Sequence, residues 1–186
     1  GAAFPEALHV PEAILHAHVF GRCAQVGAVA IADHIAGSTE KFAEMMNAEA
    51  KKLMATNSHF VNPSGLHDDN HYTTAYDLYL IFNECIKHDD FVKIINSSSY
   101  TAHITGADGA KRDVKWEPTN YYAKGEATPP DNVTIIGGKT GTTKGAGNCL
   151  ILLTKDSSGN PYISIIMGAG SKPLLYQDMT SMLSKI

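Results

Sequence analysis

Hydrophobic residues in the first half of the chain recur every three to four positions, the spacing that places side chains on one face of an α-helix. Two such stripes are present: Phe42, Met45, Met46, Ala50 and Leu53, and then Leu78, Ile81, Phe82, Cys85 and Ile86. The turn-rich stretch 57–66 separates them, and Thr73 or Thr74 is the expected N-cap of the second helix. We therefore expect two helices joined by a loop.

After Asn96 the pattern changes to short alternating segments that are typical of β-strands. Residues 157–160, Ser-Ser-Gly-Asn, indicate a hairpin turn between the last two strands, and Pro173 opens a closing helix. The order of helices, antiparallel strands and a final helix predicts an α+β fold, and the absence of a repeat or linker predicts one domain over residues 1–186. The expected strands are Tyr100–Thr105, Lys111–Trp116, 133–138, 148–155 and the segment from Tyr162 to Gly168.

Composition narrows the class of protein. The chain has 186 residues, of which 44% are hydrophobic and 18% charged, as expected for a globular domain. Its net charge of -4 offers no field that would attract nucleic acid, and its longest apolar runs are far short of the ~20 residues that span a bilayer. The three cysteines fit neither a complete disulfide framework nor a zinc spacing, and no signal peptide is visible.

The strongest local signal is Lys139-Thr140-Gly141 at the end of an apolar strand. Such a strand end places a cation and a hydroxyl beside a cleft, and the glycine lets a ligand lie against the strand edge. The N–H of the next residue, Thr142, could then form half of an oxyanion hole. By itself this short string more often marks a surface strand end with a solvated lysine.

The stretch 57–77, N-S-H-F-V-N-P-S-G-L-H-D-D-N-H-Y-T-T-A-Y-D, adds to this signal, as does Pro118-Thr119-Asn120. Together with Lys-Thr-Gly these segments resemble the low-molecular-mass penicillin-binding proteins that act as D-Ala-D-Ala carboxypeptidases, from about Ala24 to the C-terminus. That family uses the motifs Ser-x-x-Lys, Ser-x-Asn and Lys-Thr-Gly, between a helical lobe and an antiparallel sheet. The resemblance implies that Lys139 is catalytic and that the substrate is bound by Thr140, Gly141 and Thr142.

The second motif is altered in this chain. The resemblance places Cys23-Ala24-Gln25 where the family has Ser-x-Asn, which makes Cys23 and Gln25 candidate catalytic residues. A thiol is a weaker hydrogen-bonding partner than a hydroxyl, and glutamine is one methylene longer than asparagine. The alternative is that Cys23 is a small buried hydrophobic residue.

The first motif has no obvious place in this chain. Only 22 residues precede Cys23, so we expect the Ser-x-x-Lys segment and the family's N-terminal strands to be missing. Ser38-Thr39-Glu40-Lys41 spells the motif, but it falls where the family begins a helix. We therefore expect Ser38 to be an N-cap, with Glu40 in the first turn.

Histidines suggest one further chemistry. His67-Asp68-Asp69-Asn70-His71 loosely echoes the zinc motif H-E-x-x-H, which requires one helical face, whereas this segment follows Pro63 in an expected loop. His16 and His18 diverge on a helix. We therefore expect no metal site and no cofactor.

The resemblance implies a serine-type carboxypeptidase that trims peptidoglycan stem peptides outside the cytoplasmic membrane. It implies reaction with β-lactams once a nucleophile is supplied, so this chain alone is expected to be inactive. One alternative is a non-catalytic module that binds stem peptide; another is a β-lactamase, against which the stretch 57–77 counts. Because the family pairs the strand from Tyr162 to Gly168 with an N-terminal strand, its edge is expected to be open to self-association.

Overall fold

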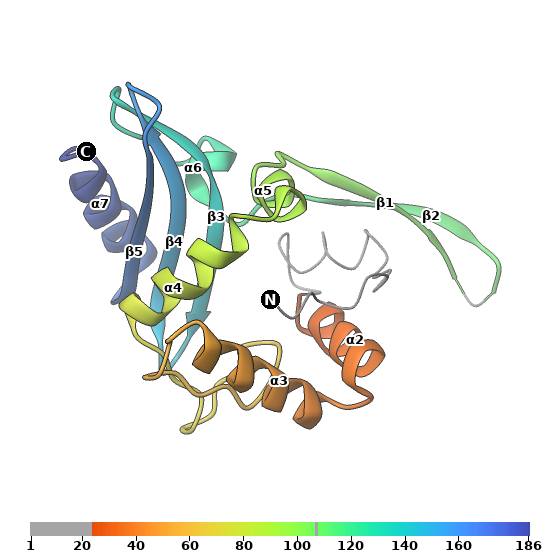
Figure 1. Ribbon diagram of the computed structural model, residues 1–186. Helices are drawn as coiled ribbons and strands as arrows, with labels where there is room; N and C mark the ends of the chain where they lie inside the picture. The colour runs from red at the N-terminus through yellow and green to blue at the C-terminus, as the bar shows by residue number, and fades with distance from the viewer. Residues whose placement is uncertain (1–23, 107) are drawn as a thin grey trace.

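The computed structural model describes residues 24–106 and 108–186 (Figure 1). Helices come first, antiparallel strands follow and a helix closes the chain, so the predicted α+β fold is confirmed. The elements are α2 (Ala24–Ala36), α3 (Thr39–Lys52), α4 (Ala75–Cys85), α5 (Asp89–Ile95), β1 (Tyr100–Thr105), β2 (Lys111–Trp116), α6 (Tyr121–Lys124), β3 (Val133–Thr143), β4 (Gly147–Asp156), β5 (Pro161–Ala169) and α7 (Lys172–Leu183).

Two separate sheets form. β3, β4 and β5 make an antiparallel sheet in that order, while β1 and β2 pair as a hairpin that projects away from it (Figure 1). β1 and β2 have the bounds expected from the sequence. β3 is longer than expected, because the Lys-Thr-Gly segment itself pairs with β4, with Lys139 opposite Ile151 and Gly141 opposite Cys149.

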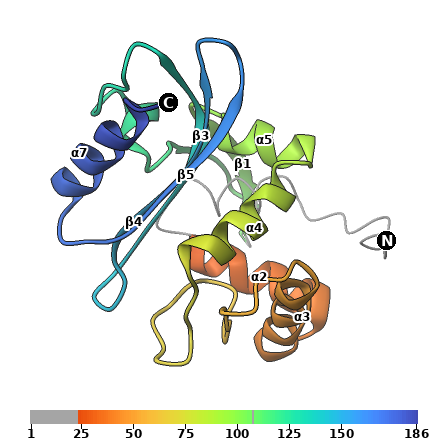
Figure 2. The ribbon, with the colours of Figure 1, turned by 60° about the vertical axis from the view of Figure 1, so that its left-hand side comes forward.

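Helices cover both faces of the three-stranded sheet. α7 lies on one face, and α4 and α5 lie on the other (Figure 2). Leu150 and Leu152 point toward α7, whereas Leu153, one position on, packs against α4 and α5, as the two-residue period of a strand requires. The larger core consists of Tyr122, Val133, Leu150, Leu152, Leu175, Tyr176, Met179 and Leu183.

The helix starts follow the predicted capping chemistry. The Ser38 hydroxyl accepts a hydrogen bond from the Lys41 N–H at 3.2 Å, so the prediction that Ser38 is an N-cap is confirmed. Thr74 caps α4 by accepting from the Asp77 N–H at 3.1 Å. Residues 57–74 form no helix, as expected, and connect α3 to α4.

α5 approaches the sheet unusually closely at one glycine. A Cβ atom on Gly137 would lie 2.1 Å from the Ile95 carbonyl oxygen at the end of α5. The β3–β4 register shifts just before Gly137, which marks an irregularity of the bulge type. Only glycine fits here, and this contact seats α5 against the strand that carries Lys139.

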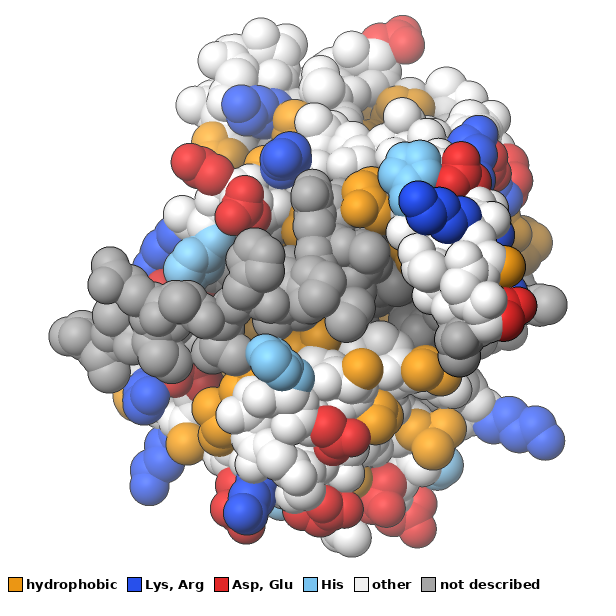
Figure 3. All heavy atoms as spheres, turned by 90° about the vertical axis from the view of Figure 1, so that its right-hand side faces the viewer, with side chains coloured by type: hydrophobic (Ala, Val, Ile, Leu, Met, Phe, Trp, Pro, Cys, Tyr) orange, Lys and Arg blue, Asp and Glu red, His pale blue; other side chains and the backbone are white. Residues whose placement is uncertain are grey.

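The surface carries charge of both signs. In the view from the side of the hairpin, basic and acidic side chains are interspersed around the rim (Figure 3). Among the described residues, no helix has the length and apolar character needed to cross a membrane.

Candidate active site

Lys139 lies on the face of the sheet that α4 covers. Cross-strand partners share a face, so the Lys139 stem projects on the same side as Ile151 and Ile165. Its Nζ donates a hydrogen bond to the Thr140 carbonyl oxygen at 2.6 Å. Burial lowers the pKa of the Lys139 ammonium, because a low-dielectric environment disfavours the charged form.

A cavity of about 230 Å³ adjoins this lysine, and its wall is almost wholly apolar. Leu78 of α4 closes it from the helical side, and the Cys149 side chain lies opposite Gly141. A cation beside an apolar cavity interacts strongly with an anion that comes close to it, since little water competes. The lining residues are Leu78, Lys139, Thr140, Gly141, Cys149, Leu150, Ile151, Ile165, Ile166 and Met167.

Thr140 and Thr142 alternate with Lys139 along the strand. The Thr140 hydroxyl lies 2.6 Å from the Thr119 hydroxyl, and the Thr142 hydroxyl donates to the Asn148 side-chain oxygen at 3.3 Å. Because alternate residues face opposite ways, neither hydroxyl leaves the strand on the same face as the Lys139 stem. The structure therefore brings the motif residues together along one strand but not onto one face.

Gly141 leaves its side of β3 open. The nearest heavy atom to a Cβ built on Gly141 is the Cys149 Cβ, at 3.9 Å, so the backbone is accessible from that side. Among the described strands β3 pairs only with β4, so its other edge is free of strand partners. An extended ligand could therefore lie along this edge and hydrogen-bond to main-chain groups.

A buried carboxylate organises the loop between α3 and α4. Asp77 is 1% exposed, and its Oδ2 accepts hydrogen bonds from the Asn57 N–H and the Ser58 hydroxyl, both at 2.7 Å. The Ser58 hydroxyl also lies 2.7 Å from the Thr73 hydroxyl. Asp77 therefore ties the beginning of the loop to its end and to the first turn of α4.

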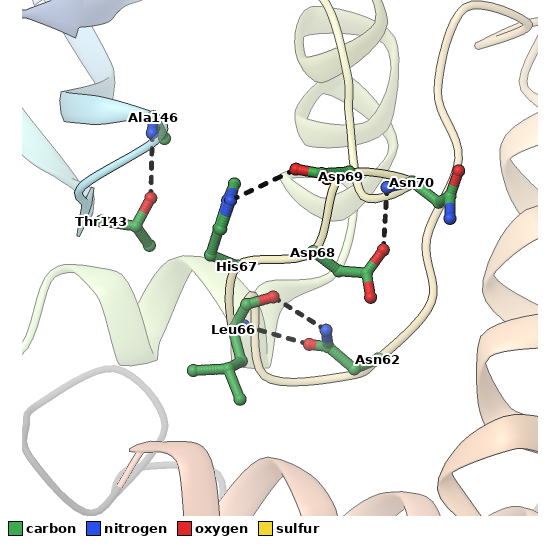
Figure 4. Close-up of polar contacts among 8 residues, drawn as sticks. All are labelled: Asn62, Leu66, His67, Asp68, Asp69, Asn70, Thr143 and Ala146. Carbon is green, nitrogen blue, oxygen red and sulfur yellow. Dashed lines mark hydrogen bonds and ion pairs between the residues drawn. The ribbon is translucent and has the colours of Figure 1, made fainter.

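Two asparagines brace the rest of the same loop. Asn47 of α3 pairs with the backbone of Phe60 through both ends of its amide, at 2.7 and 2.8 Å. The Asn62 side chain accepts from the Leu66 N–H at 3.1 Å and donates to the Leu66 carbonyl at 2.9 Å (Figure 4). The loop is therefore held by side chains, which gives it a defined shape beside the sheet.

The structure says less about the second motif, Cys23 and Gln25, and about the histidines. Cys23 lies outside the described residues. Gln25 is exposed at the start of α2 and makes no side-chain hydrogen bond to another described residue. His71 accepts from the Val61 N–H at 3.2 Å, and within the part of the chain that is described no three potential metal ligands gather.

Sequence reasoning did not identify two features of this region. The contact between Thr119 and Thr140 joins residues 21 positions apart, so no local pattern indicates it. The role of Asp77 had a partial signal, because Thr74-x-x-Asp77 has the spacing in which an N-cap is followed by an acidic residue. That signal predicts the helix start but not the hydrogen bonds to Asn57 and Ser58.

Comparison with known proteins gives a consistent result. The family model for D-alanyl-D-alanine carboxypeptidase, Peptidase S11, matches residues 15–171. The chain is 30% identical over 155 residues to D-alanyl-D-alanine carboxypeptidase DacF of Bacillus subtilis, covering 83% of this chain and 37% of that protein. It is 32% identical over 145 residues to DacD of Escherichia coli, covering 77% of this chain and 33% of that protein.

Solved structures agree with the sequence comparisons. The Streptomyces K15 DD-transpeptidase superposes with a TM-score of 0.82 at 26% identity, over 93% of this chain and 66% of that chain. The DacD carboxypeptidase of Francisella tularensis gives 0.70 at 23% identity, over 85% of this chain and 47% of that chain, which supports the fold alone. The chain spans about a third of the length of the two curated relatives.

Proposed function

The chain belongs to the D-alanyl-D-alanine carboxypeptidase family, and on that premise we propose that it forms the substrate-binding part of a serine-type D-Ala-D-Ala carboxypeptidase. Its substrate is then the end of a peptidoglycan stem peptide, outside the cytoplasmic membrane. The observation that carries the proposal is the Lys139–Gly141 strand segment, where a half-buried cation adjoins an accessible backbone edge.

The proposed roles follow from that geometry. An extended D-Ala-D-Ala end lies along the open edge of β3 at Gly141. A serine supplied from outside the described residues attacks the carbonyl of the penultimate D-Ala, and the Thr142 N–H donates to the oxyanion that forms. The terminal D-Ala leaves as the acyl-enzyme is produced, and water then releases the shortened peptide.

Lys139 supplies the positive charge in this scheme. Its ammonium is half-buried beside an apolar cavity, where it stabilises negative charge on the substrate more than it would in water. The chain has only two arginines, Arg22 and Arg112, and neither belongs to the Lys-Thr-Gly segment. Bidentate binding of the substrate carboxylate by an arginine is therefore not expected at this segment. We propose instead that Thr140 and Thr142, from the opposite face of β3, bind the terminal carboxylate at the open strand edge, with Lys139 supplying positive charge from the other face.

We propose that this chain alone does not form the acyl-enzyme. The one Ser-x-x-Lys string begins at Ser38, whose hydroxyl accepts from the Lys41 N–H as a helix cap. The Ser38 side chain also interacts with the Glu40 carboxylate, so this hydroxyl serves the start of α3. Cys23 and Gln25 remain candidates for the second motif.

Labelling with a fluorescent penicillin tests this proposal. The chain should remain unlabelled, whereas a version extended upstream with a Ser-x-x-Lys helix should be acylated. Changing Lys139→Ala in the extended version should remove the labelling, with Lys155→Ala as a control on an exposed lysine of β4. Stable labelling of the unextended chain that disappears in Ser38→Ala would show that Ser38 is the nucleophile and that our assignment is wrong.

A non-catalytic module that binds stem peptide is the second candidate. It is favoured by the capping role of Ser38 and by the exposure of Gln25 at a motif position. Titration calorimetry of both versions with a peptide ending in D-Ala-D-Ala separates the two functions. Binding without labelling in the extended version would support the module, and labelling would support the enzyme.

A further inference from the structure

The loop between α3 and α4 contacts the turn between β3 and β4, immediately beyond the Lys-Thr-Gly segment. His67 at the tip of the loop lies between that turn and Asp69 (Figure 4). A Cβ atom on Gly145 would lie 2.6 Å from the His67 Cε1 and 2.7 Å from its Nδ1. The imidazole therefore rests against the Gly145 backbone, in space that any other residue at that position would fill.

Both sides of this contact are held in place. On the loop side, Asn62 clamps Leu66, and the Asp68 carboxylate accepts from the Asn70 N–H at 2.8 Å. The Nε2 atom of His67 lies 3.6 Å from the Asp69 Oδ1. The imidazole thus stands on a loop segment whose backbone is fixed on both sides of it.

On the sheet side, the turn has its own internal support. The Thr143 hydroxyl accepts from the Ala146 N–H at 2.9 Å, and Gly147 has a φ of +66°, which glycine adopts at little cost. Thr142 stands directly before this turn and pairs with Asn148 directly after it. Gly145 therefore lies three residues from Thr142, in the turn that directly follows it.

From these contacts we propose that His67 is a positioning residue: its imidazole braces the turn 143–147 and thereby holds the Thr142 N–H in place. The catalytic meaning of this brace rests on the proposed function, in which Thr142 donates to the oxyanion. The contact between His67 and the turn does not rest on the proposed function. Misplacement of a catalytic group by about 1 Å can cost on the order of 100-fold in rate, so such a brace affects catalysis without touching substrate.

The contact can be tested by a double-mutant cycle, in which Gly145→Ala should have an effect only while the His67 ring is present. Gly145→Ala alone should displace the imidazole, and His67→Ala alone should remove it. In the double variant the new methyl group no longer meets the ring, so Gly145→Ala should add nothing to His67→Ala. His67→Phe keeps a flat ring without a titratable group and should retain the brace. Gly170→Ala is the matched control, because a Cβ there meets nothing within 4 Å.

The primary measurement is made on this chain by NMR and needs no activity. We expect His67→Ala and Gly145→Ala each to shift the Thr142 amide resonance and to speed exchange of the Ala146 amide about fivefold or more, since its hydrogen bond lies inside the braced turn. Gly170→Ala should change neither signal. Additive effects in the double variant, or an unchanged Thr142 resonance in both single variants, would overturn the proposal.

A second measurement separates this proposal from the proposed function. In the version extended with a Ser-x-x-Lys helix, His67→Ala should slow acylation by penicillin about tenfold at saturating concentration while leaving the half-saturating concentration unchanged, and His67→Phe should restore most of the rate. If the NMR cycle behaves as expected but the acylation rate of His67→Ala equals that of the parent, the positioning role is refuted. If no extended variant is acylated, the proposed function fails while the NMR cycle still decides whether the brace exists.

Discussion

Replacing Asp77 by alanine should destabilise the protein more than any other single truncation in the loop region. The carboxylate is 1% exposed, and its Oδ2 accepts two hydrogen bonds of 2.7 Å from Asn57 and Ser58. Its Oδ1 is buried without a hydrogen-bond partner. Asp77→Ala removes both bonds and leaves the Asn57 N–H without its acceptor.

The magnitude follows from these three facts. Hydrogen bonds to a charged group contribute about 1.5–3 kcal/mol each, so the two bonds together account for about 3–6 kcal/mol. Removing the unpaired Oδ1 recovers part of this, because burying an unsatisfied polar atom costs about 1–3 kcal/mol. We therefore expect a net loss of about 3 kcal/mol in the free energy of unfolding, or a fall in Tm of about 6–12 °C for a domain of this size.

Urea denaturation followed by circular dichroism measures this loss directly. Asp77→Asn keeps an acceptor oxygen without the charge, so it should lose less than Asp77→Ala. Asp178→Ala is the matched control, because Asp178 is exposed on α7 and its removal should change stability by no more than about 0.5 kcal/mol. If Asp77→Ala were as stable as Asp178→Ala, the view that Asp77 holds the loop would be wrong.

Three further predictions concern the cavity, the cysteines and the sheet edge. Lys139→Met should raise the free energy of unfolding at neutral pH, because burial lowers the pKa of Lys139 in the folded protein. The unfolded chain holds this proton more tightly, so the advantage of Lys139→Met should shrink as the pH rises toward 10.5. Urea denaturation at two pH values would measure the change. Cys85 should react slowest with iodoacetamide, since burial and Glu84 raise the pKa of its thiol, and Cys23 should react first if it lies near Lys139. Mass spectrometry over time gives the order of labelling, and slow labelling of Cys23 would make it a structural residue. We also propose that the chain self-associates through β5, an edge among the described strands, which light scattering would contradict by showing a monomer at high concentration.

The amino-acid sequence by itself determined the order and type of most elements. Strand alternation and helical spacing are local properties, so β1 and β2 were predicted at their observed bounds and α3 and α4 near theirs. Capping chemistry is equally local, which is why Ser38 and Thr74 were recognised as helix starts. The Lys-Thr-Gly string was also found without the structure, since its meaning depends on three adjacent residues at a strand end.

Only the tertiary structure decided what surrounds that string. The sequence placed Lys-Thr-Gly at a strand end, but it did not indicate that paired β3 continues to Thr143, because the glycines at 137 and 138 interrupt the apolar run. The packing partners of these glycines, Ile95 and Ile151, lie on other elements. The hydrogen bonds of Asp77 and the contact between His67 and Gly145 join segments about 20 and 80 residues apart. Such contacts form only when the whole chain packs, so a local sequence pattern does not predict them.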